Sequence, residues 1–89
     1  MARHLSALKR ARQNKKRRLR NQGRKTQVKH RVRDVRLAVA QNNLPEAETA
    51  LQKAIPIIAQ VAGKGTLHWR AAARKISRLT RQVNALKSA

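Results

Sequence analysis

The chain has 89 residues, which is enough for one small domain at most. Its 23 Lys and Arg residues outnumber 3 Asp and Glu residues, so the net charge is +20; cysteine is absent, which excludes disulfides and thiolate metal sites and suits a reducing compartment. Trp69 is the only aromatic residue, and a core with so few large apolar side chains is too thin for an enzyme with a roomy pocket.

The excess positive charge destabilises any compact state unless an anion offsets it. Nucleic acid, an anionic membrane surface and an acidic protein are the candidate partners. No stretch approaches the roughly 18 consecutive apolar residues that a membrane-spanning helix needs, and no apolar segment typical of a secretion signal follows Met1. We therefore expect a cytoplasmic protein without a membrane partner.

Residues 6–42 are predicted to form one long helix, because no proline interrupts residues 1–44 and Leu, Arg, Lys and Gln favour helix. Its length would be about 55 Å at 1.5 Å per residue. Apolar residues at the spacing of one helix face run only from Val28 to Val39. The end of this helix can therefore pack in a bundle, whereas the part before Val28 has no protein surface to bury against and is predicted to protrude.

Two shorter helices are predicted to follow, over residues 45–62 and 67–87. Asn42, Asn43 and Pro45 predict the end of the first helix and the start of the second. The apolar face of the second helix comprises Ala47, Ala50, Leu51, Ala54, Ile55, Ile58, Val61 and Ala62. The third helix, with Thr66 as candidate N-cap, has an apolar stripe of Trp69, Ala72, Ile76, Leu79, Val83 and Leu86. The expected fold is all-α: a three-helix antiparallel bundle with a long, basic, protruding N-terminal helix, in a single domain over residues 1–89.

The first helix carries basic residues on every face. Residues 9–25 contain ten of them and no acid: Lys9, Arg10, Arg12, Lys15, Lys16, Arg17, Arg18, Arg20, Arg24 and Lys25. A membrane-surface helix would keep one broad apolar face, whereas charge around the whole cylinder suits a site with phosphates on several sides. Because the planar fork of Arg bridges phosphate oxygens, the pattern strongly indicates nucleic acid.

The same pattern discriminates less between kinds of nucleic acid. A basic helix that leads into a leucine zipper needs several apolar heptads, and the stripe from Val28 to Val39 covers fewer than two. A helix-turn-helix usually confines its charge to one helix, but here the third helix is also basic, at Arg70, Arg74, Arg78 and Arg81. RNA modules that stack bases on Phe or Tyr are excluded. Two alternatives remain: recognition of folded RNA by shape and backbone, or non-specific packaging by a small architectural DNA-compacting protein.

No set of residues indicates catalysis or metal binding. His30, Asp34 and Ser77 complete the inventory of a catalytic triad on paper only. The scattered histidines and acids do not form a metal site, and Gly63-Lys64-Gly65 is too short for a phosphate-binding loop. We expect no enzyme activity, no cofactor, no metal and no small-molecule substrate.

Two residues at the start of the third helix have alternative roles. Trp69 shares the apolar stripe, so a place in the core is favoured over stacking on a base. His68 either donates to a phosphate at the positive end of the helix or is a surface or capping residue.

The chain contains two long motifs. The first comprises Leu5-Ser6-Ala7-Leu8-Lys9-Arg10, Arg12-Gln13-Asn14 and Lys16-Arg17-Arg18-Leu19-Arg20-Asn21; the second comprises Lys64-Gly65-Thr66-Leu67-His68, Ala71-Ala72-Ala73-Arg74-Lys75 and Ser77-Arg78-Leu79. With this spacing and the neutral, Ala-rich stretch between them, the motifs resemble the bacterial family of small-subunit ribosomal protein twenty over residues 5–86.

The resemblance implies a three-helix bundle that binds 16S ribosomal RNA early in assembly of the small (30S) ribosomal subunit, bridging the 5′ domain and the long penultimate helix near the 3′ end. It implies a place in the cytoplasmic ribosome, and we expect few protein contacts and no homo-oligomer. The matched positions that would contact RNA are Ser6, Lys9, Arg10, Gln13, Asn14, Lys16, Arg17, Arg18, Arg20, Asn21, Lys64, Gly65, His68, Arg74, Ser77 and Arg78. Five further basic residues are also predicted to contact RNA: Arg12, Lys15, Arg24, Lys25 and Lys75. The family usually has Lys-Asn where this chain has Trp69-Arg70, so a salt-type contact through Arg70 and a partly exposed Trp69 are expected there.

Overall fold

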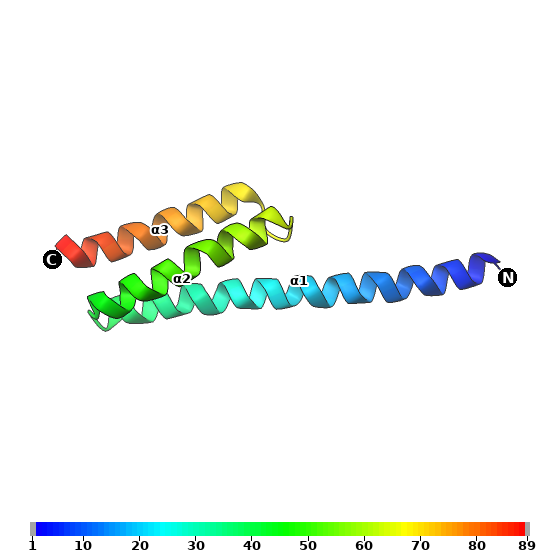
Figure 1. The fold of residues 1–89 in the computed structure, drawn as a ribbon, viewed down its shortest axis with the longest axis horizontal. Helices are drawn as coiled ribbons and strands as arrows, with labels where there is room; N and C mark the ends of the chain where they lie inside the picture. Colours follow the sequence, from blue (N-terminus) through cyan, green and yellow to red (C-terminus); the bar gives the residue numbers. More distant parts are fainter. Residues whose placement is uncertain (1, 89) are drawn as a thin grey trace.

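The computed structural model describes residues 2–88, which form three helices: α1 (Ala2–Ala40), α2 (Leu44–Gly63) and α3 (Trp69–Ser88). The second helix folds back along the last part of α1, and α3 folds back along α2 (Figure 1). The predicted all-α, three-helix antiparallel bundle is therefore confirmed. Compared with the sequence-based bounds, α1 begins and ends earlier, and α3 begins two residues later.

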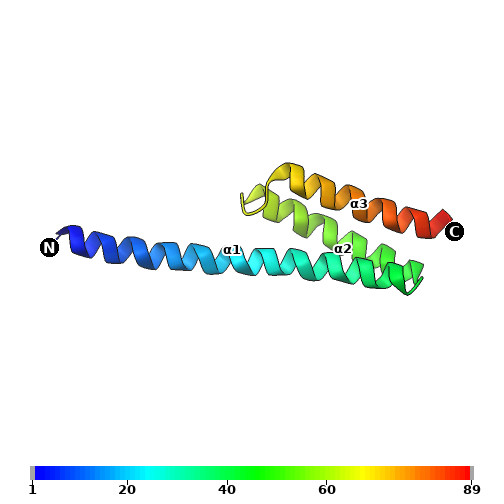
Figure 2. The ribbon, with the colours of Figure 1, turned by 180° about the vertical axis from the view of Figure 1, so that it is seen from behind.

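Helix α1 gives the molecule its elongated shape. It has 39 residues, and the molecule measures 68 × 21 × 14 Å. From either side, the first half of α1 extends beyond the loop between α2 and α3, and the chain ends lie at opposite ends of the molecule (Figure 2). The long protruding helix is therefore confirmed as well. Within residues 2–88, no helix has an apolar stretch that could cross a bilayer.

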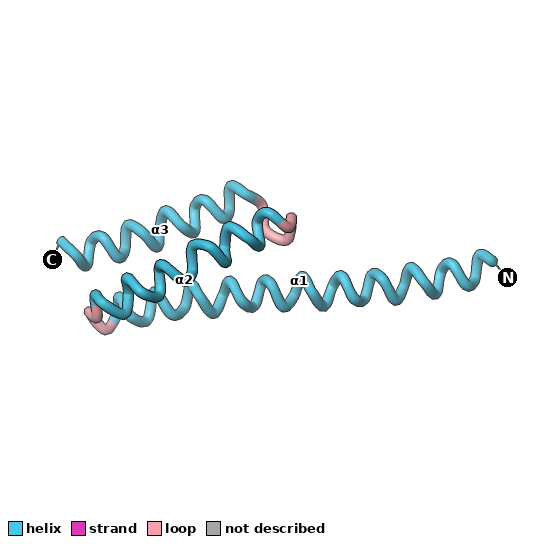
Figure 3. Tube along the Cα trace, viewed as in Figure 1, coloured by secondary structure: helices cyan, strands magenta, loops and turns pink. Residues whose placement is uncertain are grey.

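Two short loops connect the helices at opposite ends of the bundle (Figure 3). At the first, Asn42 adopts the left-handed φ of 54° that asparagine tolerates, which ends α1. The side chain of Asn43 then caps α2, because its Oδ1 accepts a hydrogen bond from the Glu46 amide at 3.3 Å. With Pro45 in the first turn of α2, the break between α1 and α2 lies at the asparagines and the proline from which the sequence predicts it.

At the second loop, the prediction that Thr66 caps α3 is wrong. Gly65 turns the chain with a left-handed φ of 79°, and α3 begins only at Trp69. His68 is the capping residue: its carbonyl accepts from the Ala72 amide at 3.0 Å and its Nδ1 from the Arg70 amide at 3.1 Å. The hydroxyl of Thr66 is used in a contact with α1 instead.

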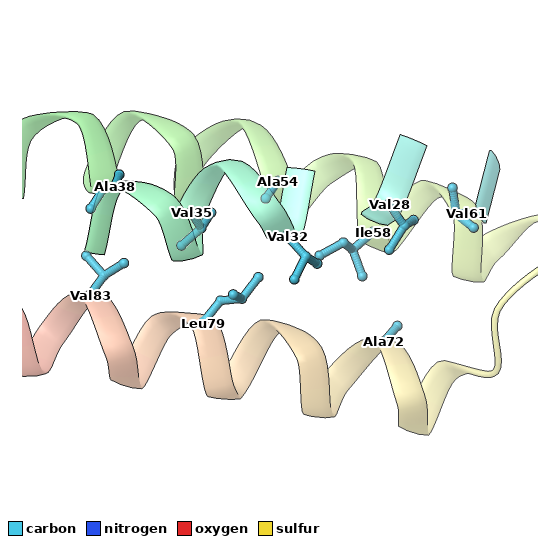
Figure 4. Packing of buried hydrophobic residues seen from close by; sticks show 11 residues of the cluster. Val28, Val32, Val35, Ala38, Ala54, Ile58, Val61, Ala72, Leu79 and Val83 are labelled. Carbon is cyan, nitrogen blue, oxygen red and sulfur yellow. The ribbon is translucent and has the colours of Figure 1, made fainter. Parts of the chain in front are cut away.

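The core lies where the three apolar stripes meet, and their side chains point toward one another (Figure 4). Its buried members are Val28, Val32, Val35, Ala38, Ala47, Ala54, Ile58, Val61, Ala72, Leu79 and Val83. The favoured place of Trp69 in the core is wrong, because its side chain is 63% exposed. Leu67 of the preceding loop packs against the core at this end of the bundle, and Trp69, the first residue of α3, lies outside the core.

Candidate nucleic-acid interface

The arm, defined as residues 4–20 of α1, is the part that precedes the first side-chain contact with the rest of the molecule. Every residue of the arm is exposed, including Leu5, Leu8 and Leu19. It carries eight basic side chains and no acid. All predicted contact residues of this segment therefore lie on an open cylinder: Ser6, Lys9, Arg10, Arg12, Gln13, Asn14, Lys15, Lys16, Arg17, Arg18 and Arg20.

The two motifs meet at the base of the arm through three side chains. The Thr66 hydroxyl donates to Asn21 Oδ1 at 3.1 Å and accepts from Arg24 Nη1 at 3.3 Å; Arg24 Nη1 also lies 3.4 Å from Asn21 Oδ1. We call this set the Asn21–Arg24–Thr66 clamp. Two predicted RNA contacts, Asn21 and Arg24, are thus engaged within the protein, a role that sequence reasoning missed because Thr66 lies more than forty residues away.

The clamp holds the loop that carries the second set of predicted residues. Lys64, Gly65 and His68 in and beside this loop are exposed, as is Lys25 one turn after Asn21 on α1. Because Thr66 is hydrogen bonded to α1, these residues belong to one continuous surface at the base of the arm. Basic groups of α1 and of the loop are brought together there.

The start of α3 presents three exposed groups in a row. The Trp69 ring stacks on His68, with ring centroids 5.8 Å apart and planes inclined by 25°, and the Arg70 guanidinium carbon lies 5.2 Å from the Trp69 centroid, within cation–π range. Because His68 Nδ1 accepts from the Arg70 amide, a neutral His68 ring carries its proton on Nε2. His68 therefore caps the helix and still has a donor free for a phosphate, so the two alternative roles are compatible.

The outer face of α3 gathers most of the remaining predicted residues. Arg74, Ser77 and Arg78 line one shallow hollow together with Ala73 and Arg81. Arg81 was not among the predicted site residues, although its helical spacing places it on the basic face. Lys75 lies apart from this hollow, in a groove between α3 and α1.

Sequence reasoning also missed three basic residues of α1 in that groove. Lys29, Arg33 and Arg36 line it with Lys75, Val28, Val32 and Leu37. Their spacing of four and three residues places them on one helix face, a signal that the sequence carries. They were overlooked because the apolar stripe from Val28 to Val39 marks the same segment as part of the core.

The acidic residues line neither the α3 hollow nor the groove between α1 and α3. Asp34 and Glu46 line a different groove, between α1 and α2, together with Arg31 and Lys53. Glu48 forms an exposed ion pair with Lys87, with Oε1 and Nζ 3.3 Å apart. In the part of the chain that the structure describes, no three His, Asp or Glu side chains are grouped so that they could hold a metal ion.

Comparison with known proteins agrees with this geometry. The family model of ribosomal protein S20 matches residues 2–84. The small ribosomal subunit protein bS20 of Nitratidesulfovibrio vulgaris (strain DP4) is 49% identical over 84 residues, which is 94% of this chain and 97% of the relative. Its counterpart in Syntrophobacter fumaroxidans is 46% identical over 86 residues, covering 97% and 100% of the two chains, and that of Geobacter metallireducens is 45% identical over 86 residues, covering 97% and 99%. The resemblance seen in the two motifs is confirmed, and the chain belongs to the ribosomal protein S20 family.

Proposed function

We propose that the chain is a structural component of the small ribosomal subunit that binds 16S ribosomal RNA directly, as a single RNA-binding domain. Membership of the S20 family supports this, since the relatives are named small ribosomal subunit proteins. One observation carries it further: the arm is exposed on all sides, with eight basic side chains and no acid. Only a polyanion that surrounds the arm can neutralise it on every face.

The binding free energy comes mainly from the phosphates. Each Lys or Arg that reaches a phosphate releases condensed counterions, so the affinity falls steeply as salt rises. Arg predominates in the arm, and its planar guanidinium can bridge two phosphate oxygens and stack on an unpaired base. The arm therefore reads RNA shape and charge rather than base sequence.

The bundle gives the arm a fixed partner surface. The clamp holds Lys64, Gly65 and His68 at the base of the arm, and the hollow with Arg74, Ser77 and Arg78 lies on the outside of α3. RNA strands that contact both places are held in one relative arrangement. A ligand that binds only the native arrangement stabilises it by mass action, and this is how the protein stabilises folding and assembly of the RNA without any chemical step.

The test is a binding and footprinting experiment with the full chain. A transcript of the 16S 5′ domain, an unrelated structured RNA of equal length and a DNA duplex are titrated at several KCl concentrations, and hydroxyl-radical protection is mapped on each. We expect tighter binding to the 16S transcript, with protection at discrete positions. Equal affinity for all three, without discrete protection, would instead support a DNA-compacting protein.

A further inference from the structure

A groove between α1 and α3 lies outside the surface that the two motifs predict. Lys29, Arg33 and Arg36 of α1 line it, with Lys75 contributed by α3. Val28, Val32 and Leu37 complete the lining. We call this the α1–α3 groove. Its four basic side chains are exposed, and none of its lining residues is acidic.

The cations of this groove continue a stripe that begins on the arm. Arg18, Lys25, Lys29, Arg33 and Arg36 are separated by seven, four, four and three residues. At 3.6 residues per turn, these separations keep all five on one face of α1. A chain of phosphates that follows this face therefore passes from the arm across the base and into the groove without crossing an acidic residue.

The three acids of the chain do not compete for these cations. Asp34 and Glu46 line the neighbouring groove between α1 and α2, which shares Leu37 with this one, and Glu48 is paired with Lys87. The positive potential in the α1–α3 groove is therefore available to a bound anion. Lys75 adds to it from a second helix, so the charges flank the groove instead of forming a single ridge.

We propose that the α1–α3 groove is a second binding site for the phosphate backbone of the RNA. This rests on the proposed function and extends the contact surface beyond the two motifs, to Lys29, Arg33 and Arg36. An acidic amphipathic peptide fits less well, because Leu37, at 53% exposed, is the single exposed apolar side chain of the groove, whereas Val28 and Val32 are only 5% and 8% exposed. Such a peptide would meet four cations but one exposed apolar side chain, whereas interfaces of this kind depend on a cluster of anchoring side chains.

The test compares two variants with the same loss of charge. The groove variant is Lys29→Gln, Arg33→Gln and Arg36→Gln, in which glutamine retains part of each aliphatic stem and favours helix. The control variant is Arg31→Gln, Lys53→Gln and Lys87→Gln, which removes three cations from the sides of the bundle that hold the acids. Circular dichroism and thermal melting of both variants establish that the bundle is folded.

Affinity for the 16S 5′-domain transcript is then measured against KCl concentration. We expect the groove variant to reduce the slope of log affinity against log salt by about two to three, which corresponds to about 100- to 1,000-fold weaker binding at 0.1 M salt if the affinities converge at 1 M. The control variant should change the slope by less than about one, because its cations contact no phosphate. The groove variant should also lose hydroxyl-radical protection at one limited set of nucleotides, different from the set lost when Arg17 and Arg18 are replaced.

The outcomes separate this proposal from the proposed function. If the wild-type chain binds the transcript but the groove variant behaves like the control, only the groove proposal is overturned. If the groove variant keeps its RNA affinity yet fails to enter small subunits, the groove cations act on something other than the RNA and the groove proposal is again wrong. If the wild-type chain does not select the transcript, the proposed function fails, and the groove proposal with it.

Discussion

Thr66 Oγ1 and Asn21 Oδ1 lie 3.1 Å apart, so one hydrogen bond joins the loop between α2 and α3 to the middle of the long helix. Arg24 reinforces this link by donating to Thr66 Oγ1 at 3.3 Å. The contact involves no core residue, and its place between the two motifs is better explained by positioning than by stability. It fixes where the loop cations stand relative to the arm.

The first prediction tests this positioning role with Thr66→Val, which keeps the β-branched shape and removes the hydroxyl. We expect a stability loss under about 1 kcal/mol, since net hydrogen bonds at partly exposed sites contribute little. RNA affinity should fall by about three- to tenfold, corresponding to about 0.7–1.4 kcal/mol, because the loop and the arm no longer hold one geometry. The measurements are thermal melting and RNA titration.

Thr49→Val is the matched control. The Thr49 hydroxyl donates to the Pro45 carbonyl at 2.9 Å within one helix, so its loss removes a hydrogen bond without separating two elements. It should cost similar stability and leave RNA affinity unchanged. Equal RNA affinities of the two valine variants would show that the clamp has no positioning role.

A second prediction uses Trp69, the only aromatic residue of the chain, as a reporter. Its ring is 63% exposed, beside the exposed side chains of His68 and Arg70. If this corner binds RNA, the emission of Trp69 should be quenched and shifted to shorter wavelength on titration with the 16S transcript, and high salt should reverse the change. Emission that stays constant while the RNA is demonstrably bound would place Trp69 outside the interface.

The misplacement of Trp69 shows what periodicity can and cannot predict. The stripes on α1 and α2 correctly identified Val35 and Ile58 as core residues, because a 3.6-residue repeat reports which face of a helix is covered. The repeat does not show at which residue along the helix the packing against the other helices ends. At the start of α3 the loop residue Leu67 packs against the core, and Trp69, the first residue of the repeat on α3, is exposed to solvent.

The part of the candidate binding surface that lies on one continuous segment, the arm, could be predicted from the sequence. Exposure of the arm follows from its composition alone, because a segment with so few apolar side chains has nothing to bury. The spacing of Lys29, Arg33 and Arg36 places these cations on one helix face, but the clamp and the α1–α3 groove also depend on which helices lie side by side, and no local pattern carries that information. Thr66 shows the difference: as a sequence signal it resembles a helix cap, yet in the bundle its hydroxyl contacts Asn21.

A third prediction concerns the arm itself. Replacing Arg17 and Arg18 with alanine should lower the slope of RNA affinity against salt by about one to two units, because two phosphate contacts are removed. The melting temperature should stay unchanged, since both side chains are exposed and far from the core. An unchanged slope would mean that these arginines do not reach phosphates.

A fourth prediction tests the core. Ile58 is fully buried, and Ile58→Asp places an unpaired carboxylate among apolar side chains of all three helices. We expect destabilisation of about 4 kcal/mol or more, which is comparable to the whole stability of a small domain. Circular dichroism should show loss of cooperative melting. The exposed position Gln60 on the same helix is the control, where aspartate should be tolerated; similar melting curves for both variants would show that Ile58 is not central to the bundle.

The last prediction is that the arm forms a stable helix only when an anion surrounds it. Most of the stability of a helix in a protein comes from packing of its apolar face, and like charges four residues apart, as at Arg12, Lys16 and Arg20, each cost about 0.2–0.5 kcal/mol. Gly23 at the base weakens the helix by about 1 kcal/mol more relative to alanine. No packing compensates, because every residue of the arm is exposed.

Amide hydrogen exchange measures this directly. In dilute buffer without RNA, arm amides should exchange at nearly the rate of an unfolded peptide, while amides near Val35 and Leu79 in the core exchange slowly. Adding the 16S transcript should protect the arm and leave the core amides almost unchanged, because binding then supplies the free energy that orders the helix. Protection of the arm equal to that of α3 in the free protein would mean that the helix is preformed, and the salt dependence of binding would then report phosphate contacts alone.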